Sequence, residues 1–100
     1  MNRTPVFKKS DDPRIPDNCI GWFDEQESTL ICNSKNEPNQ DWECIRITRK
    51  GKFVKQSISC SNKQYGNWHE IGADEAAFFI LAWGSEMPEC LIPHIKNVEL

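Results

Sequence analysis

The chain has 100 residues and a mass of 11.6 kDa, with 12 Lys and Arg against 15 Asp and Glu, so its formal net charge is −3. This length suits one domain and leaves no room for a second independent core. Four Trp, five Phe and one Tyr argue against disorder, and no apolar run approaches the ~18 residues that span a membrane. These values predict a small, mildly acidic globular protein.

The N-terminal region and the cysteines indicate a compartment. The first twenty residues hold no continuous hydrophobic region, so we expect no secretory signal peptide. The cysteine spacing matches neither a disulfide framework nor a CxxC pair. The five are Cys19, Cys32, Cys44, Cys60 and Cys90. Since four of them lie in or beside apolar runs, we expect buried, reduced thiols in a cytoplasmic protein.

The first third of the chain predicts an arm followed by a hairpin. Residues 1–18 read as an irregular N-terminal arm because three prolines interrupt a mostly polar stretch. Two short apolar runs, 19–23 and 29–32, flank a polar turn at 24–28, which favours a β-hairpin. A loop rich in turn residues follows at 33–40.

The central hairpin is the clearest element. Strands are predicted at 42–48 and 53–59, with Gly51 in the turn between them. A two-residue Lys50-Gly51 loop would pair Thr48 with Phe53 and gather the β-branched residues on one face. A three-residue loop with Gly51 as a bulge would shift the pairing by one and mix the faces. We favour the first register because it separates apolar from polar residues.

A loop at 61–67 is expected to lead into a helix. Asp74 is the favoured N-cap, with Gly72 or Ala73 as alternative starts, and Gly84 suits the left-handed turn at the end. The helix carries two apolar stripes. The first consists of Ala76, Phe79, Ile80 and Trp83, and the second of Phe78, Leu81 and Ala82. The short apolar run at 91–95 either caps this helix or forms an edge strand.

These elements predict an α+β fold for a single domain at 19–100. The expected architecture is a small antiparallel β-meander of about four strands packed against one α-helix in the C-terminal half. A single sheet buries one stripe of the helix. The other stripe would then meet the tail, the arm or a second chain, so a homodimer is one possibility.

Catalytic and metal motifs are weak in this sequence. The glycines are dispersed singly, so no phosphate-binding loop can be built, and His69-Glu70 begins an HExxH motif that Ala73 interrupts. Cys60, His69, Cys90 and His94 supply zinc-ligand types and possible Cys–His nucleophilic pairs. Their spacing is too open for a compact zinc knuckle. We therefore predict no enzyme activity, no cofactor and no metal.

The charge distribution is the unusual feature. Residues 17–43 carry seven acidic side chains and one basic, and residues 64–100 carry six acidic and one basic. Between these blocks, residues 44–63 carry six basic side chains and no acidic one. Screening by the neighbouring acidic segments would explain this block without any partner. A surface that binds an acidic macromolecule is the alternative explanation.

The sequence thus favours a non-catalytic protein–protein interaction module, a small intracellular inhibitor or regulator that blocks a macromolecular partner. Standalone toxin antidotes and phage-encoded inhibitors of host defence often have this size and charge. Aromatic and Arg side chains anchor many interfaces, which adds Trp22, Tyr65 and Trp83 as further candidates. The predicted partner-binding residues are Trp42, Arg46, Arg49, Lys50, Lys52, Phe53, Lys55, Phe78 and Leu81.

The alternative function is a nucleic-acid-binding regulator that uses the basic hairpin 44–63. Phe53 or Trp42 would then stack on bases. The sequence pI of about 5.3 works against nonspecific attraction to phosphate, so this hypothesis ranks second. No membrane partner is expected.

Overall fold

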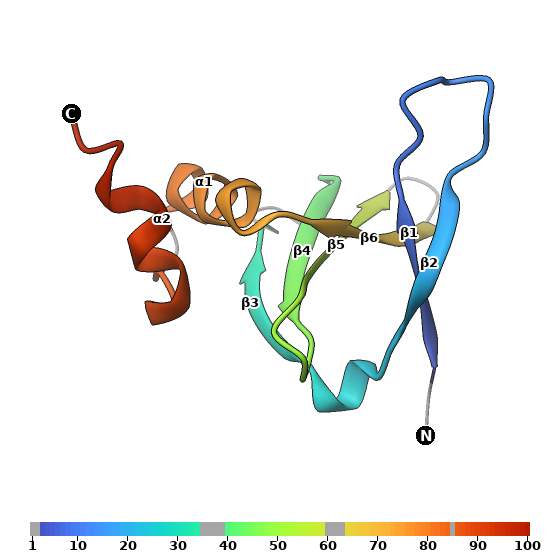
Figure 1. The fold of residues 1–100 in the computed structure, drawn as a ribbon, viewed down its shortest axis with the longest axis horizontal. Helices are drawn as coiled ribbons and strands as arrows, with labels where there is room; N and C mark the ends of the chain where they lie inside the picture. Colours follow the sequence, from blue (N-terminus) through green and yellow to red (C-terminus); the bar gives the residue numbers. More distant parts are fainter. Residues whose placement is uncertain (1–2, 35–39, 60–63, 85) are drawn as a thin grey trace.

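The computed structural model describes residues 3–34, 40–59, 64–84 and 86–100 (Figure 1). The fold is α+β, as predicted, with one mixed sheet and two short α-helices. The strands are β1 (Thr4–Lys8), β2 (Asn18–Phe23), β3 (Thr29–Asn33), β4 (Trp42–Ile47), β5 (Phe53–Ser59) and β6 (Gln64–Ile71). The helices are α1 (Ala73–Trp83) and α2 (Ile92–Lys96), with 3-10 turns η1 (Glu25–Glu27) and η2 (Glu89–Leu91).

The sheet has six strands in the order β2-β1-β6-β5-β4-β3, where about four were expected. Neighbouring strands are antiparallel except β1 and β6, which run parallel. The simple meander is therefore corrected to a mixed sheet. Its extra strands come from two segments that the sequence had presented as irregular.

The first of these segments is the expected N-terminal arm. Thr4–Lys8 forms β1, which pairs with β2 on one side and with β6 on the other. Val6 is 6% exposed and packs in the core, while Phe7 lies beside the His69 ring at 6.3 Å between ring centroids. Because polar residues surround this apolar pair, the local sequence gives little sign of a strand. The second neighbour of β1 in the sheet is β6, which lies far along the chain.

The second segment is the expected loop at 61–67. Gln64–Ile71 forms β6 near the centre of the sheet, while residues 60–63 lie outside the described residues. The β5–β6 register shifts between Gln56 and Ile58. At this bulge a Cβ on Gly66 would lie 2.8 Å from the Ser57 carbonyl oxygen. The glycine and the irregular register break the alternation by which a strand is recognised.

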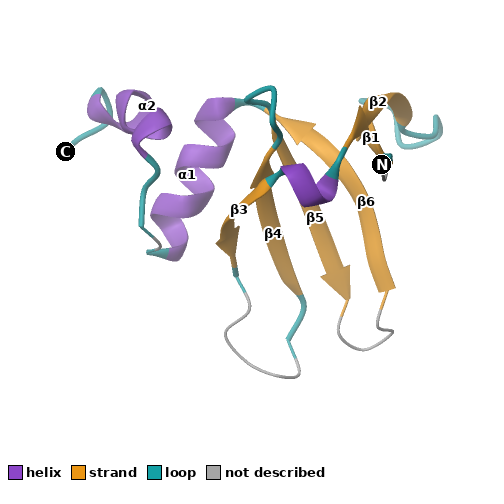
Figure 2. Ribbon diagram, turned by 90° about the horizontal axis from the view of Figure 1, so that it is seen from below, coloured by secondary structure: helices purple, strands orange, loops and turns teal. Residues whose placement is uncertain are grey.

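The predicted hairpin of 19–23 with 29–32 is wrong, because β2 and β3 lie at opposite edges of the sheet. The connection between them comprises residues 24–28 and includes η1. A flat sheet would separate these edges by five strand spacings, ~24 Å, whereas six extended Cα steps reach at most ~22 Å. The sheet therefore curls toward a partly open barrel, and η1 links its two edges (Figures 1 and 2).

The register of the central hairpin is also corrected. Ile47 pairs with Phe53, Arg46 with Val54 and Ile45 with Lys55, which is the three-residue-loop alternative. Gly51 has φ +81°, a backbone conformation in which side-chain-bearing residues are strained. Each hairpin strand therefore places apolar residues on both faces of the sheet.

The two faces carry two separate cores. The inner face, toward which the sheet curls, buries Val6, Phe23, Cys44, Val54, Ile58 and Trp68. The outer face packs against α1 and buries Cys32, Ile45, Ala76, Ala77, Ile80 and Leu91. This division explains the shifted register, since each face needs its own set of apolar side chains.

Helix α1 begins at Ala73 with Gly72 as N-cap, so the favoured N-cap Asp74 is wrong and the alternative start is correct. It ends at the predicted Gly84, which has φ +69°. The C-terminal run forms η2 and α2 against α1, with Leu91 fully buried, and forms no edge strand. No helix of the described segments has the length and apolar character needed to cross a membrane.

Candidate functional site

A cleft opens on the inner face, at the end of the sheet where the β4–β5 turn and η1 lie. Its cavity has a volume of about 320 Å³. The floor is apolar and the wall formed by the β4–β5 turn is basic. The lining residues are Val6, Ile20, Gly21, Trp22, Phe23, Asp24, Thr48, Arg49, Lys50, Lys52, Val54 and Glu70.

The basic wall is held by the turn that the shifted register creates. The Thr48 amide donates to the Lys52 carbonyl at 2.8 Å, and the Gly51 amide donates to the Thr48 carbonyl at 2.9 Å. The Thr48 hydroxyl also accepts from the Lys52 amide at 3.1 Å. These bonds close a three-residue loop of Arg49, Lys50 and Gly51, a loop length in which glycine at the left-handed position is common.

The opposite wall is strand β2. Ile20 is 45% exposed and Trp22 is 46% exposed, although both are large apolar residues. The Arg3 guanidinium lies 5.2 Å from the Trp22 ring centroid, a cation–π distance that orients the indole. Between them, a Cβ on Gly21 would meet no atom within 4 Å, so the space over this glycine is open.

The floor is rigid. Val6, Phe23 and Val54 are each at most 6% exposed, and they belong to one inner-face core. The Phe23 ring packs edge-to-face on Trp68, with 5.3 Å between centroids and an interplanar angle of 77°. An apolar group entering the cleft would meet a packed apolar surface.

The electrostatics of the cleft are mixed. Arg49, Lys50 and Lys52 form no ion pair within the described part of the chain. Asp24 and Glu70 line the same cleft, so its charged side chains sum to one positive charge. The Asp24 carboxylate already accepts a hydrogen bond from the Gln26 amide at 3.0 Å. The turn can therefore bind a carboxylate, while the two acids disfavour a run of phosphates.

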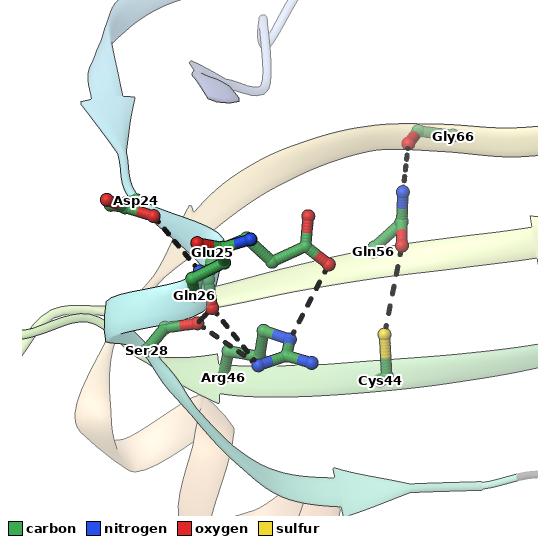
Figure 3. A network of polar contacts seen from close by, with 8 residues as sticks. All are labelled: Asp24, Glu25, Gln26, Ser28, Cys44, Arg46, Gln56 and Gly66. Carbon is green, nitrogen blue, oxygen red and sulfur yellow. Dashed lines mark hydrogen bonds and ion pairs between the residues drawn. The ribbon is translucent and has the colours of Figure 1, made fainter. Parts of the chain in front are cut away.

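Arg46, another predicted partner-binding residue, forms polar contacts within the fold (Figure 3). Its Nη1 atom donates to the Ser28 hydroxyl at 3.2 Å and to the Glu25 carbonyl at 3.5 Å. Its Nε lies 3.8 Å from a Glu25 carboxylate oxygen. Arg46 thus fastens η1, the link between the two sheet edges, to β4.

Lys55 and Phe53 also lie in contacts with the rest of the chain. The Lys55 ammonium lies 3.1 Å from Glu43 and 3.9 Å from Glu75, and 5.5 Å from the Phe79 ring centroid. Phe53 packs against the outer-face core. For Arg46 and Lys55, carboxylates of the acidic segments supply the expected internal screening of the basic hairpin.

The remaining predicted residues lie away from the cleft. Phe78 and Leu81 are 46% and 51% exposed on α1. Trp42 packs against the inner-face core and borders a wide hollow of about 710 Å³, with Tyr65 and Trp83. Of the nine predicted partner-binding residues, the structure gathers Arg49, Lys50 and Lys52 in one cleft.

Sequence reasoning missed the β2 and floor residues of this cleft as a set. Ile20, Gly21 and Phe23 line it together with Val6 and Val54. One signal was present in the sequence: residues 19–23 form an apolar run, and residues 18–23 carry no charge. This run indicates a binding wall only if β2 is an edge strand. The predicted hairpin of 19–23 with 29–32 placed a second strand beside it instead.

The described cysteines and histidines form no grouped site. The two histidines pair with aspartates, His69 with Asp17 at 2.6 Å and His94 with Asp74 at 2.7 Å. Cys60 lies outside the described residues, and no three His, Cys, Asp or Glu side chains elsewhere gather as metal ligands.

The four described cysteines are free, but their burial differs from the expectation. Cys32 and Cys44 are buried, whereas Cys19 and Cys90 are exposed, which corrects the prediction of buried thiols for those two. Burial raises the pKa of the Cys44 thiol. This thiol therefore remains protonated at neutral pH.

Comparison with protein-family models, with curated proteins and with solved structures gives no match.

Proposed function

We propose that this chain is a non-catalytic protein-binding module that docks on an acidic segment of a partner protein and blocks it. The observation that carries the proposal is the cleft, where an apolar floor meets three basic side chains that have no described ion-pair partner. Protein interfaces commonly combine an apolar centre with a polar or charged rim.

The basic side chains of the hairpin differ in whether they are ion-paired within the fold, and this difference supports the proposal. Arg46 and Lys55 are held by Glu25, Glu43 and Glu75, so their positive charges are compensated within the fold. The charges of the turn remain available at the cleft. Complementary charge on a partner would raise the association rate and the specificity of binding.

Nucleic acid is the second candidate for the same turn. Asp24 and Glu70 in the cleft wall oppose a phosphate backbone, and Phe53 packs beneath α1 instead of standing free to stack on bases. These two observations favour a protein partner. The experiment that follows separates the two.

The test is affinity capture with the immobilised full chain from extract of the cells that produce it, with and without nuclease. The cleft variant carries Arg49→Gln, Lys50→Gln and Lys52→Gln. The control variant carries Lys8→Gln, Lys9→Gln and Lys96→Gln, three exposed residues outside the cleft, so both variants lose the same charge.

The proposal expects one stoichiometric protein, retained after nuclease treatment by the wild type and the control and lost by the cleft variant. Equal capture by both variants would contradict it. Recovery of nucleic acid that nuclease removes would support the second candidate instead. Circular dichroism of each variant checks that the fold is intact.

A further inference from the structure

Strand β2 forms one edge of the sheet and is unusually open. Its burial pattern is exposed at five consecutive positions, from Asn18 to Trp22. Strand β3, at the other edge, has Cys32 buried and Ile31 half-buried. Of the two edges, β2 offers more uncovered strand.

The sequence of β2 lacks the charged residues and prolines that commonly protect an edge. Natural edge strands are blunted by lysines, prolines, β-bulges, inward charges or short length. Residues Asn18–Phe23 contain no charged residue and no proline over six positions. The strand is bulged near Ile20, where its register with β1 shifts. As an edge strand, β2 turns the backbone groups of alternate residues away from β1, toward the position that an added strand would take.

The cleft adjoins this edge directly. Four consecutive residues, 20–23, form one wall, and Arg49, Lys50 and Lys52 form the wall facing it. Gly21 pairs with Val6, so a side chain at Gly21 would point to the inner face. Because glycine leaves that space empty, the floor of the cleft stays uncovered beside the edge.

The chemistry of the walls defines the occupant. Side chains of an added strand alternate between the two faces of a sheet, so every second one would point toward the cleft. An apolar side chain fits over Gly21, against the floor of Val6 and Val54. An acidic side chain nearer the turn would meet the basic wall.

We propose that β2 receives an extended acidic segment of the partner protein as an added strand, with one apolar side chain seated over Gly21. Acidic side chains of the segment pair with Arg49, Lys50 and Lys52. This inference rests on the proposed function and specifies the form of the partner. Main-chain pairing supplies affinity, and the cleft supplies specificity.

The probe is a displayed library of random octapeptides selected on the immobilised full chain. The expected enriched peptides combine acidic residues with an apolar residue and lack proline. A synthetic copy of the best peptide is then N-methylated at one amide at a time. Methylation at every second amide should weaken binding about tenfold, while the intervening amides should tolerate it, since only alternate amides bond to the edge.

The protein-side variant is Gly21→Val. Nothing lies within 4 Å of a Cβ there, so the free protein accommodates the side chain, but valine fills the space the peptide needs. We expect binding to weaken about tenfold or more, since the seated group is displaced from a packed site. Thr29→Val, which places the same side chain at an exposed position on the other edge, is the control and should leave affinity unchanged.

Cysteine alkylation is a second test of whether the peptide binds along the β2 edge. Cys19 lies on β2 and Cys90 on η2, and both are exposed. Bound peptide should slow modification of Cys19 and leave Cys90 unaffected.

The outcomes separate this inference from the proposed function. One outcome is that peptides bind the wild type but not the cleft variant, while N-methylation weakens binding without an alternating pattern. This outcome would overturn the added strand and leave the protein-binding proposal standing. Unchanged affinity of Gly21→Val would also overturn it. A library that yields no binder, or binders indifferent to the cleft variant, would contradict both.

Discussion

The Oδ2 atom of Asp17 lies 2.6 Å from Nε2 of His69, although 52 residues separate them in the sequence. The other ring nitrogen, Nδ1, lies 3.2 Å from the Asn67 carbonyl oxygen. A carbonyl and a carboxylate are both acceptors, so the two bonds form together only when the ring carries both protons. Asp17 also accepts from the Ser10 amide at 3.1 Å. This contact ties the β1–β2 loop to β6.

The first prediction concerns pH. The hydrogen bond from His69, with that from the Ser10 amide, holds the pKa of Asp17 below its usual range. A lowered folded-state pKa stabilises the protein above the unfolded value of about 3.9, and this contribution is lost as the pH falls through the folded value. We expect Asp17→Asn to be less stable than the wild type at pH 7, with the difference shrinking below about pH 4. Urea unfolding at a series of pH values measures it, and an equal difference at every pH would contradict it.

The second prediction concerns the ion pair on the outer face. Oε2 of Glu43 is buried and lacks a hydrogen bond of good geometry in the described structure, so the Lys55 ammonium 3.1 Å away supplies its compensating charge. Lys55→Met keeps the aliphatic stem and removes the charge, which should cost about 1–2 kcal/mol of unfolding free energy. Adding Glu43→Gln should recover part of the loss. Lys52→Met is the control, and strict additivity of the Lys55 and Glu43 variants would refute the coupling.

The third prediction compares two glycines. A Cβ at Gly66 would lie 2.8 Å from the Ser57 carbonyl oxygen, a backbone atom that cannot move without disturbing the bulge. Gly66→Ala should therefore destabilise the protein by about 1–3 kcal/mol. At Gly21 the same substitution meets nothing within 4 Å, and its effect should stay within about 0.5 kcal/mol. Thermal and urea unfolding of both variants test the contrast, which equal losses would remove.

The fourth prediction concerns the thiols. Cys19 and Cys90 are exposed, whereas Cys32 and Cys44 are buried. Because the thiolate is the reactive form, the raised pKa of Cys44 further slows its alkylation. Iodoacetamide at neutral pH should modify Cys19 and Cys90 first, and all thiols should react in urea. Peptide mass spectrometry follows each site; early labelling of Cys44 would show that the inner-face core is open.

The fifth prediction separates the two stripes of α1. Ile80 is fully buried, while Leu81 is 51% exposed. Ile80→Ala should cost about 2–5 kcal/mol, and Leu81→Ala should cost less than about 1 kcal/mol, in keeping with its position at the surface. Unfolding at a low and at a high protein concentration measures both, since a contribution from a partner chain grows with concentration. A large loss for Leu81→Ala would indicate a partner chain on this stripe, and sedimentation velocity would then show a dimer.

Local patterns in the sequence predicted the elements that are locally complete. The strands predicted at 19–23, 29–32, 42–48 and 53–59, and the helix that Gly84 caps, have apolar runs, turn residues or a C-terminal glycine of their own. The α+β class followed from them. The basic turn was also visible, since Arg49, Lys50 and Lys52 surround a single glycine.

The wrong predictions share a physical cause: the pairing, register and cleft in question depend on segments that lie far apart in the sequence. Thr4–Lys8 pairs with β2 along its length and joins the rest of the sheet where Val6 pairs with Trp68, and neither β1 nor β6 alternates clearly by itself. The register at Gly51 depends on the sheet having two buried faces, whereas the predicted four-stranded meander has only one. The cleft could not be predicted because its walls, β2 and the β4–β5 turn, meet only after the sheet curls.

The parallel pairing of β1 with β6 also bears on how the chain folds. Val6 must wait for Trp68, so the β1–β2 hairpin joins the rest of the sheet only after β6 is available. Closing such a long loop is slow compared with forming a hairpin or a helix. During synthesis, the β1–β2 hairpin would therefore leave the ribosome before β6, the strand that connects it to the rest of the sheet. We expect fragments that end before Gln64, and so lack β6, to lack the curled six-stranded sheet that the complete chain forms.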